Sequence, residues 1–252
     1  MKKWKKPLQF SLAVLPVAAV GAVFTCLYQF DLYSPETLEQ AAAQIGSREM
    51  LVAISVLQVL VYTFVCSFLG RLLADKTGLW WPLRIQTRVL RKVLPACVVC
   101  GILFSLDYWT FGRALPQLKD SYAAGLTPSG ILAAVFYGGV IEEILLRLFF
   151  LTLIAFLIWK LFFRARAREN IPNGVFIAAN IIAALLFAAG HIPATVTAFG
   201  GLTPLLLFRC FLLNGGLGLV FGFFYRKYGI QYAMLGHAAV HIVSKGIWLV
   251  LM

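Results

Sequence analysis

Two adjacent carboxylates, Glu142 and Glu143, stand in the middle of a long apolar segment, and Arg147 follows in the same segment. On a helix Glu143 and Arg147 have i, i+4 spacing, so they can form an ion pair on one face. Glu142 then points about 100° away and can face a different space. Because two neighbouring carboxylates disfavour joint ionisation and desolvation favours the protonated form, one of them is suited to act as a general base.

The chain has three histidines, and all of them lie within or at the end of later apolar segments: His191, His237 and His241. His237 and His241 have i, i+4 spacing and share a helix face. Peptide hydrolysis needs a base, donors for the oxyanion and an acid for the leaving amine, and these side chains can supply all three. Glu142 and the three histidines could instead hold Zn²⁺ with one open position.

The composition indicates which elements must position these groups. Hydrophobic residues make up 61% of the 252 residues and charged residues only 13%, about half the charged fraction of a soluble domain. The apolar residues form runs near 20 residues long, which is typical of membrane-spanning helices. We therefore predict an all-α polytopic transmembrane bundle forming one domain, 1–252, and not a soluble enzyme, a coiled coil or a disulfide scaffold. The seven expected spans are 8–30, 50–72, 93–112, 129–159, 175–192, 202–224 and 230–251.

The net charge of +12 follows from the distribution of basic residues between the connections. The N-terminus and the second, fourth and sixth connections hold 16 of the 22 basic residues, whereas the opposite connections hold only Arg48, Arg113 and Lys119. The 16 are Lys2, Lys3, Lys5, Lys6, Arg71, Lys76, Arg84, Arg88, Arg91, Lys92, Lys160, Arg164, Arg166, Arg168, Arg226 and Lys227. Since basic connections stay on the cytoplasmic side, we expect the N-terminus inside and the C-terminus outside in a multi-pass protein of the cell membrane. The charge is then explained without a nucleic-acid partner.

Three local patterns carry further expectations. The basic segment Met1–Lys6 before a long apolar run is expected to be part of an uncleaved signal anchor. Ser34-Pro35-Glu36 has an N-cap residue, a proline at N1 and an acidic first turn, so it predicts a short helix. The segment 80–91 begins Trp-Trp-Pro and has arginines at i, i+4 and i+7, which favours a short helix at the membrane interface.

The polar residues also resemble the motifs of a known family. The stretch 142–147 is similar to the EExxxR motif of the CaaX protease and bacteriocin-processing (CPBP) membrane peptidases, and 187–191 is similar to their FxxxH motif. The stretch 214–237 resembles their C-terminal signature, which ends in a histidine followed four residues later by Asn or Asp. The resemblance covers about 129–241, which we take as the catalytic core.

The resemblance implies an intramembrane endopeptidase that acts on membrane-tethered or lipidated peptides, of which CaaX-type prenylated tails are the best-known class. By similarity, Glu142 activates the attacking water with assistance from His191. Glu143 and Arg147 hold the local geometry, and His237 supports the oxyanion. The resemblance is compatible with a metal-free mechanism, and a divalent metal such as zinc remains the alternative.

The chain departs from the family pattern at His241, where the family has Asn or Asp. A neutral imidazole can donate one hydrogen bond, so this side chain can support the oxyanion, or it can ligate a metal. Glu143 and Arg147 could also be an ion pair that only fixes the bundle. Two other functions stay open: a proton-coupled transporter that uses the Glu/His set as a relay, and a non-catalytic bacteriocin-immunity scaffold. Inverted repeats typical of transporters are not visible in the sequence.

The depth of the site follows from the lengths of its helices. The fourth span is longer than a bilayer requires, so we expect the fourth and fifth helices to project into the cytoplasm as a hairpin around 164–170. The site then lies roughly 12–15 Å below the inner surface and opens to cytoplasmic water. Three other ionisable residues of the spans, Asp107, Arg209 and Lys245, are expected to snorkel or pair and receive no chemical role.

Overall fold

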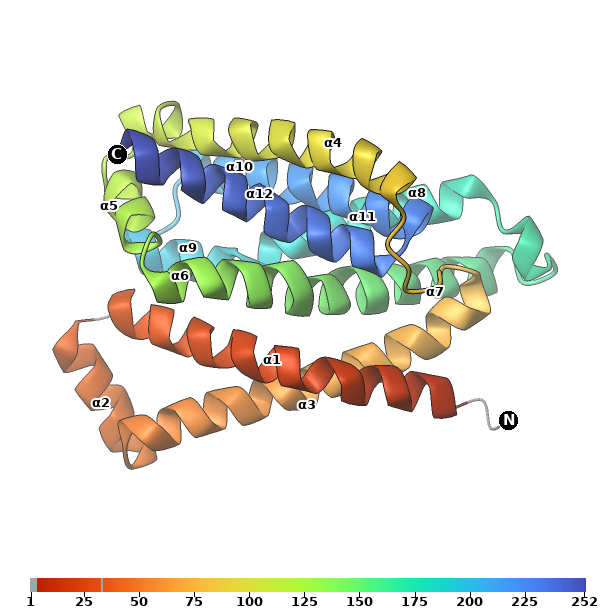
Figure 1. Ribbon diagram of the computed structural model, residues 1–252, viewed down its shortest axis with the longest axis horizontal. Helices are drawn as coiled ribbons and strands as arrows, with labels where there is room; N and C mark the ends of the chain where they lie inside the picture. Colours follow the sequence, from red (N-terminus) through yellow and green to blue (C-terminus); the bar gives the residue numbers. More distant parts are fainter. Residues whose placement is uncertain (1–3, 33) are drawn as a thin grey trace.

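The computed structural model describes residues 4–32 and 34–252, and this part of the chain contains helices and connections but no strand (Figure 1). Lys2 and Lys3, which belong to the basic N-terminal segment, lie outside the described residues. The helices, with η for 3-10 and π-helical stretches, are α1 (Lys5–Leu32), α2 (Pro35–Ile45), α3 (Arg48–Thr77), α4 (Thr87–Ser105), η1 (Leu106–Tyr108), η2 (Phe111–Arg113), α5 (Gln117–Ala124), α6 (Pro128–Ala133), η3 (Ala134–Glu142), η4 (Ile144–Leu151), α7 (Thr152–Phe162), η5 (Arg168–Asn170), α8 (Asn173–Gly190), α9 (Ile192–Phe199), α10 (Pro204–Cys210), η6 (Phe211–Gly215), α11 (Gly216–Tyr228) and α12 (Ile230–Leu251).

The prediction of seven spans is confirmed. Seven helical stretches of the described chain are long and apolar enough to cross a membrane, and the chain is a multi-pass integral membrane protein. They are Lys5–Leu32, Arg48–Thr77, Thr87–Arg113, Pro128–Phe162, Asn173–Phe199, Pro204–Tyr228 and Ile230–Leu251. Large apolar side chains such as Leu57 and Leu103 point outward, as expected where the solvent is lipid.

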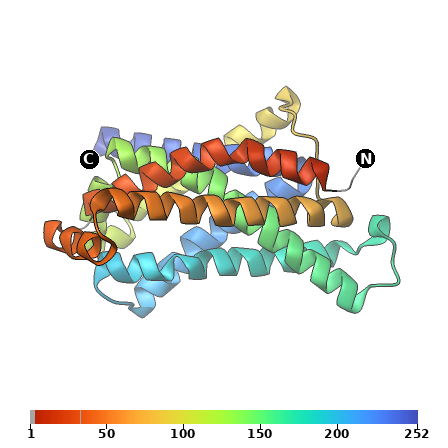
Figure 2. The ribbon, with the colours of Figure 1, turned by 90° about the horizontal axis from the view of Figure 1, so that it is seen from below.

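The long helices run roughly along one common direction (Figures 1 and 2). Helix α1 packs along α3, α4 packs along α12, and α11 lies against both α8 and α12. The largest buried cluster forms where α3, η4, α7, α8, α11 and α12 meet, around Leu148, Leu151, Phe221 and Tyr225. The fourth span contributes residues 148–159 to this cluster, and its Ile141 belongs to a second, smaller cluster with residues of α1 and α3.

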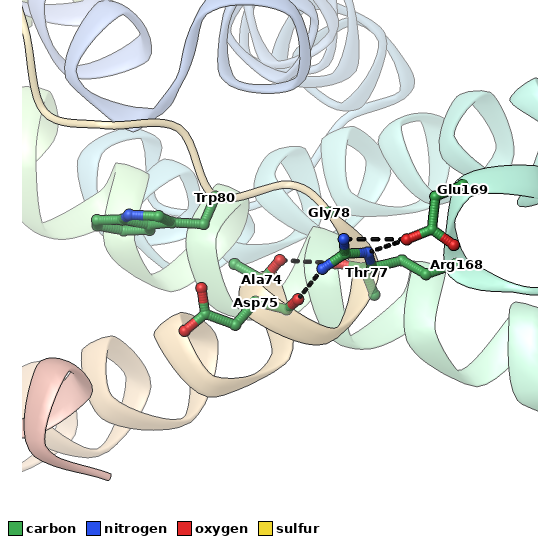
Figure 3. Close-up of a pocket in the computed structure, with 7 residues that line it drawn as sticks. All are labelled: Ala74, Asp75, Thr77, Gly78, Trp80, Arg168 and Glu169. Atoms are coloured by element: carbon green, nitrogen blue, oxygen red, sulfur yellow. Dashed lines mark hydrogen bonds and ion pairs between the residues drawn. The ribbon is translucent and has the colours of Figure 1, made fainter. Parts of the chain in front are cut away.

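The basic connections gather at one end of the bundle. Trp81 in the α3–α4 connection donates its indole N–H to the Arg226 carbonyl at 3.1 Å, and Arg168 Nη1 after α7 donates to the Asp75 carbonyl at 3.2 Å. The α7–α8 connection extends past its neighbours at this end (Figure 1). A cavity of about 410 Å³ also lies here (Figure 3), lined by Ala74, Asp75, Thr77, Gly78, Trp80, Arg168 and Glu169.

The two local helix predictions had different outcomes. Helix α2 is present, and the Ser34 hydroxyl accepts from the Thr37 backbone N–H as its N-cap. The interfacial helix over 80–91 is wrong: residues 79–86 are not helical, and α4 begins only at Thr87. The reason is tertiary, because backbone groups of this connection bond to side chains of α12. The Gln86 N–H, for example, donates to the Tyr232 hydroxyl at 2.6 Å.

Candidate active site

The fourth span changes its helical geometry at the paired carboxylates. Two π-helical stretches, Ala134–Glu142 and Ile144–Leu151, flank Glu143 within a continuous helix. Their wider i→i+5 turns are rare in proteins and occur mostly at functional sites. Glu143 is fully buried, whereas the Glu142 side chain remains 21% exposed. The two neighbouring carboxylates therefore occupy different environments, as the sequence predicted from their angular separation.

Glu143 connects the fourth span to α12. Its Oε1 atom lies 2.9 Å from Arg147 Nη1, so the expected i, i+4 ion pair is confirmed. The same oxygen lies 2.8 Å from His237 Nδ1, which donates to the carboxylate. Because the imidazole uses Nδ1–H for this bond, its Nε2 atom is left to face the rest of the site.

The Nε2 atom of His237 lies between Glu142 and His241. It is 3.2 Å from His241 Nε2, within hydrogen-bond distance, and 4.0 Å from Glu142 Oε2. The second separation is too long for a direct hydrogen bond and leaves space for a bridging group. The two carboxylates of the fourth span and the two imidazoles of the seventh span therefore lie around the His237 ring. The spacing within the Glu-Glu pair and within the His-His pair could not establish this contact between the two spans.

Aromatic rings fix the orientation of this cluster. The His237 ring stacks on Phe221 at a centroid distance of 4.6 Å and an angle of 16°. The Arg147 guanidinium lies 4.5 Å above the centroid of Phe187, the first residue of the FxxxH motif, and Arg147 Nη2 donates to the Gly218 carbonyl at 3.2 Å. The buried cation thus has one carboxylate, one carbonyl and an aromatic face as partners, which offsets its desolvation.

Residues 124–243 match the family model described as type II CAAX prenyl endopeptidase Rce1-like. This part of the chain belongs to the CPBP family of membrane endopeptidases. No curated protein and no solved structure matches the chain. The matched region contains all six residues that the motifs singled out, from Glu142 to His241. The family is a protease family, so the chain is an enzyme of the hydrolase class that is embedded in the membrane.

The remaining motif residue of the CPBP region is His191. It lies between α8 and α9, as the C-cap of the first helix and the N-cap of the second. Its Nδ1 atom is 2.8 Å from the Phe187 carbonyl, and it lies within electrostatic range of His241. Among the described residues it makes no hydrogen bond to Glu142. The Phe187 carbonyl fixes the tautomer in which Nδ1 is protonated, and Nε2 is left for a water or a substrate.

Two glycines bring the fourth span close to α12 in the CPBP region. A Cβ atom on Gly139 would lie 2.9 Å from the Cβ of Ala238, so only glycine permits this approach. A Cβ on Gly138 would lie 3.5 Å from His237 Nε2 and 3.4 Å from His241 Nε2. Neither glycine was predicted to matter from the sequence, although a Gly-Gly pair four residues before a Glu-Glu pair is a visible signal.

A tyrosine pair was also missed. The Tyr62 and Tyr137 hydroxyls are 2.6 Å apart, and both lie within electrostatic range of Glu142. Tyr62 belongs to α3, outside the matched region, so the first part of the chain contributes to the surroundings of the candidate base. No sequence signal distinguishes these two tyrosines from others in the spans.

A second buried ionic network lies apart from the motif residues. Arg209 Nε is 3.0 and 2.9 Å from the two carboxylate oxygens of Asp107, which confirms that these residues pair. The Tyr122 hydroxyl also donates to Asp107, and Arg209 Nη2 donates to that hydroxyl at 2.9 Å. This network joins η1, α5 and α10.

The arrangement does not form a metal site. Within residues 4–32 and 34–252, no three His, Cys, Asp or Glu side chains are placed to hold one ion. The four alternative ligands, Glu142, His191, His237 and His241, therefore do not fit a zinc ion, and no step of the reaction is assigned to one.

Proposed function

We propose that the protein is a glutamate-dependent endopeptidase that cleaves membrane-tethered, prenylated peptide tails of the CaaX type. The observation that carries this proposal is the 4.0 Å separation between Glu142 Oε2 and His237 Nε2, together with the partial exposure of the Glu142 carboxylate. A water placed about 2.8 Å from both atoms could bridge them. The angle between its two hydrogen-bond partners, measured at the water oxygen, would be about 90°, which a bridging water accommodates.

Glu142 then acts as the general base. It takes a proton from this water, and the resulting hydroxide attacks the carbonyl carbon of the scissile bond. The protonated Glu142 next gives its proton to the leaving amine, and the C–N bond breaks to release a new carboxyl terminus and a new amino terminus. The base returns to its starting state, so no further reagent is consumed.

The imidazoles stabilise the tetrahedral oxyanion. Glu143, at 2.8 Å from His237 Nδ1, holds that ring so that its Nε2 atom faces the substrate oxygen. His241 presents its Nε2 atom to the same point. Glu143 and Arg147 position His237 without touching the substrate, and His191 is assigned the supporting role at Glu142 that the family resemblance implies.

A lipid-embedded site suits a lipidated substrate. The carboxylates and histidines belong to stretches that can cross the membrane, and an isoprenoid chain is poorly solvated by water. A peptide whose prenyl group stays in the bilayer can present its polar tail to Glu142 without extraction from the membrane.

The test is a cleavage assay with the purified full-length protein in lipid nanodiscs and matched prenylated and unprenylated peptides. We expect cleavage of the prenylated peptide and its loss in Glu142→Gln, which keeps the size of the side chain and removes only its basicity. Glu36→Gln, on the exposed face of α2, is the matched control and should remain active. Full activity of Glu142→Gln, or solute flux into liposomes without any cleavage, would contradict the proposal.

A further inference from the structure

Helix α12 carries a second polar position beyond the histidines. Lys245 follows His237 and His241 at the same i+4 interval, so the three side chains share one helix face. Lys245 is only 9% exposed, and its ammonium donates to the Gly125 carbonyl at 2.5 Å. It also lies within electrostatic range of His241.

The charge of Lys245 is not balanced by an acidic residue. No carboxylate of the described chain lies within 4.0 Å of its ammonium. Asp107, the carboxylate of the second ionic network, already accepts from Arg209 and Tyr122. An ammonium has three donors, and one carbonyl satisfies only one of them. A buried charge with so few partners is costly unless an anion binds to it.

We propose that Lys245 binds the free C-terminal carboxylate of the peptide substrate, and thereby sets the length of the released peptide. This inference rests on the proposed function, because it takes the scissile carbonyl to lie beside the Nε2 atoms of His237 and His241. The ammonium keeps the Gly125 carbonyl as one partner and gives its two remaining donors to the carboxylate. Lys245 is thus a binding residue for the end of the tail.

The distance along α12 fits a short tail. Lys245 lies eight residues beyond His237, a rise of about 12 Å. Three extended residues span about 10–11 Å, and four span about 13–14 Å. Because helical side chains point back toward the N-terminus, the long lysine side chain brings its ammonium closer to the histidines than its Cα atom is. The geometry therefore favours a tail of three residues, which is the number that follows the cysteine in a CAAX sequence.

Gly125 is suited to its place in this subsite. It connects α5 to α6, and a Cβ atom there would lie 3.3 Å from the Lys245 ammonium. A side chain at this position would therefore crowd a carboxylate that binds the same ammonium. The backbone carbonyl holds the cation, and the position has no side chain that would lie against the remaining donors.

The experiment compares membrane-anchored peptides that differ only at the C-terminus: a free acid, its amide, and acids extended by one to three residues. We expect kcat/KM of the full-length protein to be about 10- to 100-fold higher for the acid than for the amide, the usual effect of one charge-assisted hydrogen bond. Lys245→Met should cleave acid and amide equally, at the rate at which the parent protein cleaves the amide. Lys245→Arg should retain a preference for the acid, and Lys119→Met, which removes an exposed cation of α5, should retain all of it.

A binding measurement separates this inference from the proposed reaction. An aliphatic tripeptide acid should bind the parent protein more tightly than its amide, and Lys245→Met should abolish the difference. Carboxylate-dependent binding without any cleavage would support the subsite and contradict the proposed hydrolysis. Equal cleavage and equal binding of acid and amide by the parent protein, which requires no variant to fold, would overturn the inference. A preference that survives in Lys245→Met would overturn it as well.

Discussion

Replacement of Glu143 by Gln is the sharpest test of how the two carboxylates divide their roles. The change keeps the shape of a fully buried side chain and removes its charge. Arg147, whose side chain is only 2% exposed, would lose its carboxylate at 2.9 Å and keep only the Gly218 carbonyl and aromatic faces. His237 would lose its charged acceptor at 2.8 Å. One substitution therefore disturbs both the core and the candidate oxyanion donor.

The expected magnitude follows from burial. Removal of one partner from a buried ion pair costs about 3–5 kcal/mol, because the other charge stays buried without compensation. Since a glutamine oxygen can still accept one hydrogen bond, we place Glu143→Gln near the lower end, at about 3 kcal/mol of unfolding free energy. Activity should also fall, by roughly 10²–10³ if His237 no longer supports the oxyanion.

Denaturant-induced unfolding in detergent micelles, together with the peptide-cleavage assay, measures both effects. Glu142→Gln is the matched control, because it removes the neighbouring charge from a partly exposed position and should leave stability nearly unchanged. The double variant Glu143→Gln/Arg147→Met should recover stability, since it removes both members of the buried pair, but it should not recover activity. A Glu143→Gln protein that is as stable and as active as the parent would refute the assignment.

Four further predictions concern the site. His241→Asn should keep most activity and His241→Ala should lose roughly 10²–10³ in rate, because an amide can replace an imidazole donor; equal losses in both variants, with stoichiometric zinc in the purified protein, would contradict this. A chelator should leave peptide cleavage unchanged, and inactivation that is restored by added zinc would show that a metal takes part. A cysteine at position 142 should react with a membrane-impermeant thiol reagent from the cytoplasmic side, whereas labelling only from outside would overturn the expected orientation. Gly138→Val should abolish cleavage, since side-chain atoms at this position would fill the space beside both Nε2 atoms, and wild-type kcat/KM in that variant would exclude this space as the reaction site.

The elements that the sequence predicted well depend on neighbours along the chain. A run of about 20 apolar residues specifies a spanning helix whatever packs against it, so all seven spans were predictable. The Glu143–Arg147 pair follows from i, i+4 geometry on one helix, and the Ser34 cap of α2 from the residues next to it. The basic connections predict which end of the bundle faces the cytoplasm, and the labelling experiment above tests this.

The site itself depended on contacts between distant segments. His237 is 94 residues from Glu143, and Tyr62 is 75 residues from Tyr137, so no periodicity links either pair. The partners of Lys245 and the π-helical turns around the carboxylates are equally invisible in the sequence. The wrong interfacial helix over 80–91 has the same origin, because its backbone donors and acceptors bond to other helices.

The sequence by itself thus determined the membrane class, the number of spans and the residues able to do chemistry, because apolar runs and helical spacings are local properties. The tertiary structure decided that the Glu143–Arg147 pair is buried while Glu142 stays partly accessible, and it brought the imidazoles to both carboxylates. These outcomes depend on how the fourth span packs against α12, where the missing side chain of Gly139 permits close contact with Ala238. The packing of two helices is a property of both surfaces together, and neither segment specifies it alone.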